Sequence, residues 1–236
     1  RYFGYHGYLN GKTAEEVWNL CNAKLQEDGM SVRNLIRQSN VTLLCTTDDP
    51  ADSLEWHKVI AEDATFDVQV LPAWRPDKAM NIEKPDYAEY LVKLGDAAGM
   101  EIRSFGDLKT ALKKRMEFFD SMGCKVSDHA LEYVMYAPAE ESRIEELFAK
   151  RLEGKALTKE EVLQFKTAYM IFVGKEYHRL GWAMQIHYGC KRDNNVFRYG
   201  QLGPDTGYDC IDNYAPSAQM ADFLNALNAT DQLPKT

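Results

Sequence analysis

Several motifs that would identify an enzyme class directly are missing from this sequence. It contains no GxGxxG and no GxxxxGK[ST] motif, so nothing in it predicts a dinucleotide site or a phosphate-binding loop. It also lacks HxH, HxxxH and HExxH pairs, and a metal site needs ligands at such close spacing. We therefore expect no metal site within the chain unless residues outside it complete one.

The sequence also has little that suggests a membrane, a nucleic acid or secretion. No apolar run approaches the roughly 18 residues that span a bilayer, and no signal-peptide pattern opens the chain. The formal net charge of −8 argues against nucleic acid or an anionic membrane as partner. The five cysteines form no CxxC pair, which is typical of free thiols in a reducing cytosol. We expect a cytoplasmic protein, with Cys45 and Cys124 buried in apolar strands.

What the sequence does contain is a repeated pattern of apolar strand, polar turn and helix. Strands are predicted at 41–45, 68–71, 124–126 and 182–186, and helices at 51–62, 87–98, 107–122, 139–151, 158–179 and 217–227. Such alternation indicates an α/β fold with a parallel sheet. Four strands leave open edges, whereas eight close into a barrel.

We therefore predict part of a (β/α)8 TIM barrel, about four βα units with extra helices. Residues 1–236 are expected to form a single domain. Within it, residues 1–40 form a helical lead-in and residues 41–236 the partial barrel. The chain begins with Arg rather than Met, which suggests a piece of a longer protein.

Polar side chains follow each predicted strand. In a barrel the carboxyl ends of the strands meet on one face, and catalytic groups come from several of them. The candidates after the four strands are Thr46, Thr47 and Asp48; Trp74, Arg75 and Asp77; Ser127, Asp128 and His129; and His187, Arg192 and Asn194.

For Arg75, two interpretations stay open. Its planar guanidinium could clamp a substrate carboxylate, or it could form a salt bridge to Asp77 or to a neighbouring strand end. Asp48 and Asp49 are interpreted as helix-capping carboxylates rather than ligands, with Asp49 as N-cap and Pro50 in the first turn.

The histidines divide into two groups. Asp128 and His129 could be an acid–base pair, or a histidine held by a neighbouring carboxylate. His187 ends a strand, so it could face the barrel mouth or be a satisfied core residue. We interpret the remaining histidines, His6, His57 and His178, as structural.

Taken together, six runs of sequence resemble the uronate (glucuronate) isomerase family over essentially the whole chain. They are CTTDDP at 45–50, LPAWRPDK at 71–78, SDH at 127–129, MQIHYG at 184–189, RDNN at 192–195 and LGPDTGYD at 202–209. The terminal LPKT at 233–236 is similar to the start of that family's next strand. Cys190 and Lys191 depart from the family pattern, but the polar residues after them are kept.

This resemblance implies an amidohydrolase-type (β/α)8 barrel, of which the chain would be roughly strands 2 to 5. It implies interconversion of D-glucuronate with D-fructuronate, and of D-galacturonate with D-tagaturonate, by proton transfer through an enediol. It also implies a divalent metal, often zinc, held by an HxH motif after the first strand and an Asp after the last. Neither motif is present here, so the fragment alone is expected to be inactive.

The resemblance further implies roles for particular residues. His187 and Asp128 are the expected catalytic residues, with His187 beside the metal and sugar. Arg75 and Trp74, with Arg192 and Asn194, are expected to bind substrate, and Arg75 is the best candidate for gripping the carboxylate. His129 is expected to support the site from behind.

The expected partner is a small hexuronate, and a homo-oligomer is left open. Two other interpretations compete with the isomerase. One is a metal-dependent hydrolase on the same fold, since the fold does not choose the reaction. The other is a non-catalytic fragment that associates with itself through its open strand edges.

Overall fold

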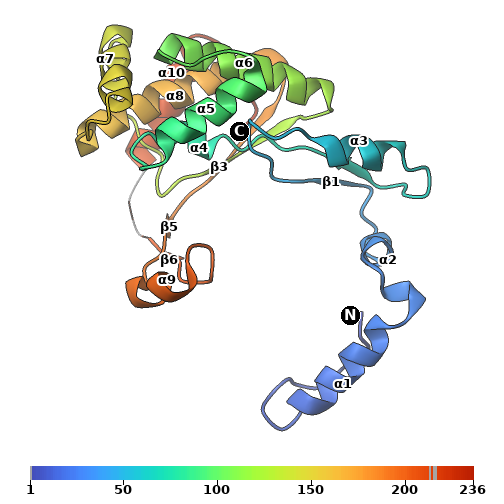
Figure 1. The fold of residues 1–236 in the computed structure, drawn as a ribbon. Helices are drawn as coiled ribbons and strands as arrows, with labels where there is room; N and C mark the ends of the chain where they lie inside the picture. The colour runs from blue at the N-terminus through green and yellow to red at the C-terminus, as the bar shows by residue number, and fades with distance from the viewer. Residues whose placement is uncertain (1, 213, 215–216) are drawn as a thin grey trace. The chain divides into compact units, whose positions relative to one another are not determined.

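The computed structural model describes residues 2–212, 214 and 217–236, and helices and strands alternate along most of that length (Figure 1). In order they are α1 Ala14–Leu25, the 3₁₀ helix η1 Asp28–Met30, α2 Val32–Gln38, β1 Leu43–Cys45, α3 Glu55–Glu62, β2 Gln69–Leu71, α4 Asp77–Met80, α5 Tyr87–Ala98, α6 Phe105–Ser121, β3 Val126–Ala130, α7 Glu141–Leu152, α8 Lys159–Leu180, β4 Ala183–His187, β5 Cys190–Lys191, α9 Val196–Leu202, β6 Cys210–Ile211 and α10 Ser217–Asn228. None of the helices in this described part is long and apolar enough to cross a membrane.

The chain divides into two compact units. Unit 1 consists of Arg1–Cys45 and Trp56–Leu71, and unit 2 of Thr46–Glu55 and Pro72–Thr236. Unit 1 therefore contains the expected helical lead-in, residues 1–40, together with β1, β2 and most of α3.

In unit 1, β1 and β2 pair in parallel, with Leu43 opposite Gln69 and Cys45 opposite Leu71. Cys45 is exposed, so the prediction that it is buried is wrong. The reason is that β1 alternates exposed, half-buried and exposed positions, as a strand covered on one face does. Cys124 in unit 2 is buried as predicted.

In unit 2, β3 and β4 pair in parallel from Val126 opposite Ala183 to Ala130 opposite His187. Single parallel bridges continue the pairing on both sides, joining Asp48 to Trp74, Trp74 to Ser127, and Ala183 to Lys235. Each bridged or paired segment of unit 2 thus lies next to the one that precedes it in the chain. This order confirms the predicted α/β class.

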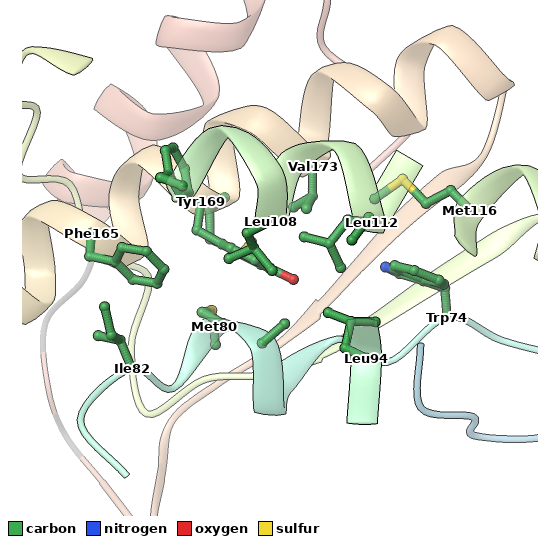
Figure 2. Close-up of a cluster of buried hydrophobic side chains, with 14 of the residues drawn as sticks. Trp74, Met80, Ile82, Leu94, Leu108, Leu112, Met116, Phe165, Tyr169 and Val173 are labelled. Carbon is green, nitrogen blue, oxygen red and sulfur yellow. The ribbon is translucent and has the colours of Figure 1, made fainter. Parts of the chain in front are cut away.

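Helices α4, α5, α6, α8 and α10 pack together beside β3 in unit 2 (Figure 1). Figure 2 shows their side chains converging on one cluster. Its fully buried members include Leu94 from α5, Leu108, Leu112 and Met116 from α6, and Phe165, Tyr169 and Val173 from α8. Because these large apolar side chains lie behind the strands, they hold the strand backbones in fixed positions for the site.

Local capping explains where the longest helices begin. Thr158 accepts the backbone N–H of Glu161, and the Glu161 side chain accepts the backbone N–H of Thr158, which forms a capping box at the start of α8. Helix α6 begins at Phe105, and the side chain of its N-cap Ser104 accepts the Asp107 N–H. Asp107, where this helix was predicted to begin, therefore lies in its first turn.

The segment after β1 differs from its prediction. Asp49 does not cap a helix at residue 51, because α3 begins only at Glu55. Its carboxylate accepts the Ala51 N–H in a turn, and Leu54 has a left-handed φ of 54°, which interrupts any helix there. Residues 190–211, for which no strand or helix was predicted, also contain regular structure. There β5 and β6 form an antiparallel pair, and α9 lies between them in the chain.

Candidate functional site

The register of β3 and β4 decides which of their side chains can meet. β3 extends to Ala130, beyond the predicted 124–126, so Asp128 and His129 lie within the strand and point to opposite faces. Asp128 and Ala130 share a face, and Ala130 is paired with His187. Asp128 and His187 are therefore diagonal neighbours on one face of the pair.

The same alternation separates Trp74 from Arg75. Trp74 is bridged to Ser127, and both side chains are fully buried. The Trp74 ring points into the hydrophobic cluster (Figure 2) and meets the edge of Phe119 at a centroid distance of 4.9 Å. Arg75, the next residue, lies on the face that carries Asp128. The structure thus places Trp74 in the core and away from the face where we predicted substrate contacts.

Four charged or titratable side chains meet on that face, namely Arg75, Asp77, Asp128 and His187, and we call them the Arg75 cluster. Arg75 Nε donates to Asp77 Oδ2 at 3.0 Å. Its Nη1 lies 3.6 Å from Asp128 Oδ2, and its Nη2 lies 3.3 Å from His187 Nε2. All three nitrogens of the guanidinium therefore face a polar partner. The predicted alternative for Arg75, a salt bridge to Asp77 and a neighbouring strand end, is confirmed.

Asp128 and His187 form the second contact of the cluster. His187 Nε2 lies 3.1 Å from Asp128 Oδ1 and 3.3 Å from Arg75 Nη2. This nitrogen can accept a hydrogen from the guanidinium only when it carries no proton, and it can donate to the carboxylate only when it carries one. The Asp128 side chain is 16% exposed and that of His187 is 43% exposed. The pair therefore has a half-buried carboxylate and an exposed imidazole whose contacts depend on whether Nε2 holds a proton.

Asp77 is enclosed about as much as Asp128, with side chains 18% and 16% exposed. Burial raises the pKa of the Asp77 carboxyl, and the hydrogen bond from Arg75 opposes that rise by favouring the charged form. Both Asp77 oxygens also lie 3.4 Å from the Ala130 N–H at the end of β3. Asp77 thus connects the loop of Arg75 to the strand of Asp128.

Asp48, also at a strand end, is engaged by its own surroundings. Its Oδ2 accepts the Thr46 hydroxyl at 2.6 Å and the Ala73 N–H at 3.2 Å. Its backbone N–H donates to Ala73 O, and its carbonyl accepts the Arg75 N–H. Asp48 therefore ties its loop to the Arg75 loop, a structural role of the kind we favoured, although it caps no helix.

On the opposite face of β3, His129 lies fully buried against α8. Its Nε2 is 3.0 Å from the Tyr177 hydroxyl. Burial, with smaller effects from the nearby charges of His187 and Arg75, lowers the pKa of His129 to about 3. His129 is therefore a neutral core histidine behind the strand, in keeping with the supporting position predicted for it.

Arg192 and Asn194 lie outside the Arg75 cluster, in the β5–β6 segment. Arg192 Nη1 donates to Asp209 Oδ2 at 2.7 Å. The Asn194 backbone N–H donates to Tyr208 O at 2.9 Å. Both contacts close the loop between the two short strands. Arg192 nevertheless lines the same cavity as Arg75. Substrate binding by the Asn194 side chain stays a prediction.

That cavity has a volume of about 1010 Å³, and of the Arg75 cluster it is lined by Arg75 and Asp77 but not by Asp128 or His187. Arg75, Asp77 and Ala130 line it on the strand side, and Lys191 and Arg192 line it on the β5 side. The other charged groups in its wall are of both signs: Glu83, Lys84, Glu132, Lys159, Lys166, Asp205 and Asp212. The cavity is large enough for a six-carbon acid, with arginines from two strand ends facing it.

The residues described do not provide a metal site. Among residues 2–212, 214 and 217–236, no group of three or more His, Cys, Asp or Glu side chains is arranged to hold a metal ion. Asp77, Asp128 and His187 instead surround the guanidinium of Arg75.

One functional feature was only partly visible in the sequence. Asp77 was a candidate salt-bridge partner for Arg75, but its contact with Ala130, more than fifty residues further on, follows only from the fold. In the sequence, the only indication of this role was that Asp77 lies two residues after Arg75, with Pro76 between them.

The fold and the Arg75 cluster together define an α/β protein with an arginine, two aspartates and a histidine grouped at the carboxyl ends of parallel strands. The chain belongs to the glucuronate isomerase family, whose model matches residues 1–236. It is 71% identical over 236 residues to the uronate isomerase of Lachnospira eligens and 66% identical to that of Lachnoclostridium phytofermentans. Each alignment covers all of this chain but only 50% and 51% of the two relatives, respectively. This chain therefore spans about half the length of these relatives.

Solved structures of uronate and glucuronate isomerases are also similar to this chain. The uronate isomerase from Thermotoga maritima superposes with a TM-score of 0.88 at 34% identity, covering 98% of this chain and 50% of that one. Glucuronate isomerase from Caulobacter crescentus superposes with a TM-score of 0.84 at 26% identity, covering 95% and 47%. The α/β fold described above is therefore similar to one continuous half of those structures.

Proposed function

We propose that the full-length protein containing this chain is a uronate isomerase. Its reaction would interconvert D-glucuronate with D-fructuronate, and D-galacturonate with D-tagaturonate. The curated relatives carry that name at up to 71% identity, and the whole chain matches the family. The structural observation that supports the proposal best is a fixed guanidinium beside a carboxylate–imidazole pair, at the strand ends of an α/β fold.

Arg75 is the group that would bind the substrate carboxylate. Its Nε is held by Asp77, so Nη1 and Nη2 form an edge that two carboxylate oxygens can meet in parallel. In the structure that edge faces Asp128 and His187. A bound hexuronate carboxylate would take up this edge and place its sugar chain beside the pair.

Asp128 and His187 are the groups that would move protons. Aldose–ketose isomerisation transfers a proton between C2 and C1 and another between the two oxygens. A carboxylate and an imidazole 3.1 Å apart can pass a proton between them and stabilise charge on a neighbouring oxygen. Asp128 and His187 lie 3.6 Å and 3.3 Å from the Arg75 guanidinium. A sugar chain whose carboxylate is bound by Arg75 would therefore have its other carbons close to the pair.

The remaining parts of the proposal concern the surroundings of this site. We place the 236 residues as about four βα units of an amidohydrolase-type (β/α)8 barrel, supported by strands that lie in chain order. Arg192 would line the substrate cavity, and Asn194 would contact substrate from the same segment. Five free thiols support a cytoplasmic location.

A divalent metal, zinc by family resemblance, belongs to the proposal for the full-length enzyme only. It would polarise the sugar oxygens, with ligands supplied by residues outside this chain, because the described residues form no group of three or more that could hold a metal. Metal analysis of the purified full-length protein tests this part. Less than one bound divalent ion for every two polypeptides would contradict it.

The role of Arg75 gives the first prediction. In the full-length protein, Arg75→Lys should raise KM for D-glucuronate about tenfold to a hundredfold, because a bidentate charge-assisted contact becomes a single one. The turnover number should change much less. The measurement is steady-state kinetics of isomerisation, with a uronate-specific coupled assay.

Arg103→Lys is the control for that experiment. Arg103 is a surface residue, and its guanidinium pairs with the similarly exposed Glu101. Its replacement should leave both kinetic constants unchanged. If Arg75→Lys behaves like Arg103→Lys, Arg75 does not bind the substrate carboxylate.

A further inference from the structure

The Arg75 cluster contains a carboxylate that the proposed reaction does not use. Asp77 touches neither Asp128 nor His187 directly, and its side chain is only 18% exposed. It accepts from Arg75 Nε at 3.0 Å and lies 3.4 Å from the Ala130 N–H through both oxygens. Burying a carboxylate is unfavourable unless it is paired, so this position calls for an explanation.

The geometry of the guanidinium supplies one. Nε is the nitrogen closest to the arginine stem, and a carboxylate that accepts its hydrogen fixes the plane of the whole group. With Nε engaged, the outer edge formed by Nη1 and Nη2 is presented in one direction. In the structure that direction is toward Asp128 and His187.

Asp77 also competes with Asp128 for the same cation. Arg75 lies closer to Asp77, at 3.0 Å, than to Asp128, at 3.6 Å. Without Asp77, the nearest carboxylate to Arg75 would be Asp128. The guanidinium could then turn to make its bidentate contact there, which would occupy the edge that a substrate carboxylate needs.

We propose that Asp77 is a positioning residue that orients Arg75 for the carboxylate of the substrate and keeps it from closing on Asp128. This inference rests on the proposed function of Arg75. The Ala130 N–H anchors Asp77 to β3, so the orientation of Arg75 is referred to the same strand that carries Asp128. Asp77 thus fixes the orientation of Arg75 relative to β3, although Asp77 itself does not contact the substrate.

The test measures binding, so that it does not depend on turnover. Two open-chain ligands are compared by calorimetry on the full-length protein. L-gulonate is the acid formed by reducing the aldehyde of D-glucuronate, and D-glucitol is its counterpart with a hydroxymethyl group in place of the carboxylate. Asp77→Ala should raise the Kd of L-gulonate about tenfold or more. The Kd of D-glucitol should stay within about twofold of the wild-type value.

A double-mutant cycle shows whether Asp77 acts through Arg75. In an Arg75→Ala background, adding Asp77→Ala should cause no further loss of L-gulonate binding, because the group that Asp77 orients is already gone. Asp77→Glu, which can still reach Nε with a carboxylate, should recover part of the lost affinity. Equal, additive losses in both backgrounds would overturn the proposal.

Asp120 provides the matched control. It is another partly buried aspartate, and it accepts from Lys125 Nζ at 2.6 Å and from Trp182 Nε1 at 2.9 Å. These partners precede β3 and β4, so Asp120 lies at the opposite ends of the strands from the Arg75 cluster. Asp120→Ala should leave the binding of both ligands unchanged.

The outcomes separate the possible roles. If Asp77→Ala weakens L-gulonate and D-glucitol equally, the residue is merely structural and the inference fails. If L-gulonate binding is unchanged, Asp77 does not orient Arg75. Failure of the wild-type protein to isomerise D-glucuronate would instead contradict the proposed function, and the two binding measurements would still decide the role of Asp77.

Discussion

His129 and Asp128 are consecutive residues with opposite environments. Asp128 belongs to the Arg75 cluster, whereas His129 is fully buried and contacts the Tyr177 hydroxyl of α8. A neutral imidazole satisfies that contact, but a protonated one would place a charge in the apolar core close to His187 and Arg75. This is why the pKa of His129 is lowered to about 3.

The lowered pKa predicts how stability depends on pH. The unfolded state binds a proton at His129 below about pH 6.5, while the folded state stays neutral until about pH 3. His129 therefore contributes full stability above pH 6.5, and the contribution falls as the pH drops toward 3. The expected loss is about 1.4 kcal/mol per pH unit within that window. Urea unfolding at several pH values between 7.5 and 4.5 measures it.

His129→Gln is the comparison for that measurement, since glutamine can bond to Tyr177 but does not titrate. The variant should lose most of the wild-type slope below pH 6.5, although it is less stable at pH 7.5. Its remaining slope reports the carboxylates, which titrate lower. A variant with the same slope as wild type would show that His129 is not the titrating group.

At the residue scale, the sequence predicted correctly that Arg75, Asp128 and His187 lie together, while it placed Trp74 wrongly, and Arg192 and Asn194 lie outside this cluster. Arg75, Asp128 and His187 come together because each follows or ends an apolar strand, and parallel strands align their ends. Trp74 was expected beside them, yet successive strand residues face opposite sides, so Trp74 and Arg75 could not both face the substrate. Only the register, set by the Trp74 to Ser127 bridge, shows which one is buried.

At the scale of elements, α5 shows a sequence feature that packing explains. Gly95 lies inside a helix, where glycine is normally unfavourable. A β-carbon built there would lie 2.6 Å from the carbonyl oxygen of Met100, because the chain folds back over the helix just after Gly99. The Met100 N–H donates to the Gly95 carbonyl at 3.0 Å, which fixes this close approach.

Gly95→Ala should therefore destabilise the protein, in spite of the better helix propensity of alanine. The new methyl group meets backbone rather than a movable side chain, and such overpacking typically costs about 1 to 3 kcal/mol. The measurement is the unfolding free energy from chemical denaturation.

Gly106→Ala is the matched substitution in α6. A β-carbon there would meet the nearest atoms, on Glu145 and Ser104, at 3.6 Å, an ordinary contact distance. It should be neutral or stabilise by up to about 1 kcal/mol. If Gly95→Ala were as stable as Gly106→Ala, the close packing at the end of α5 would be absent.

The elements predicted best are those with long periodic patterns and local caps. Helix α8 and its capping box, α10 and the strand that ends at His187 lie within a few residues of their predicted positions. The start of α3 was wrong because Asp49 and Asp52 form a turn whose hydrogen bonds imitate a cap. The β5–β6 pair was missed because two-residue strands have no detectable period.

At the scale of the whole molecule, the chain spans about half the length of the solved structures that it resembles. The superposition on the Thermotoga maritima structure covers 98% of this chain and 50% of that one, at a TM-score of 0.88. The strand ends bring together an arginine and a carboxylate–imidazole pair, while the described residues form no group of three or more ligands able to hold a metal. Under the proposed function, we expect residues outside these 236 to complete the site.

The most direct test is an assay of two polypeptides side by side, residues 1–236 alone and the full-length protein, each with added divalent metal. Conversion of D-glucuronate to D-fructuronate is followed, and a simple amide and a lactone are offered as alternative substrates. We predict isomerisation by the full-length protein, none by residues 1–236, and no hydrolysis by either. Hydrolysis without isomerisation, or full activity of the 236 residues alone, would contradict the account.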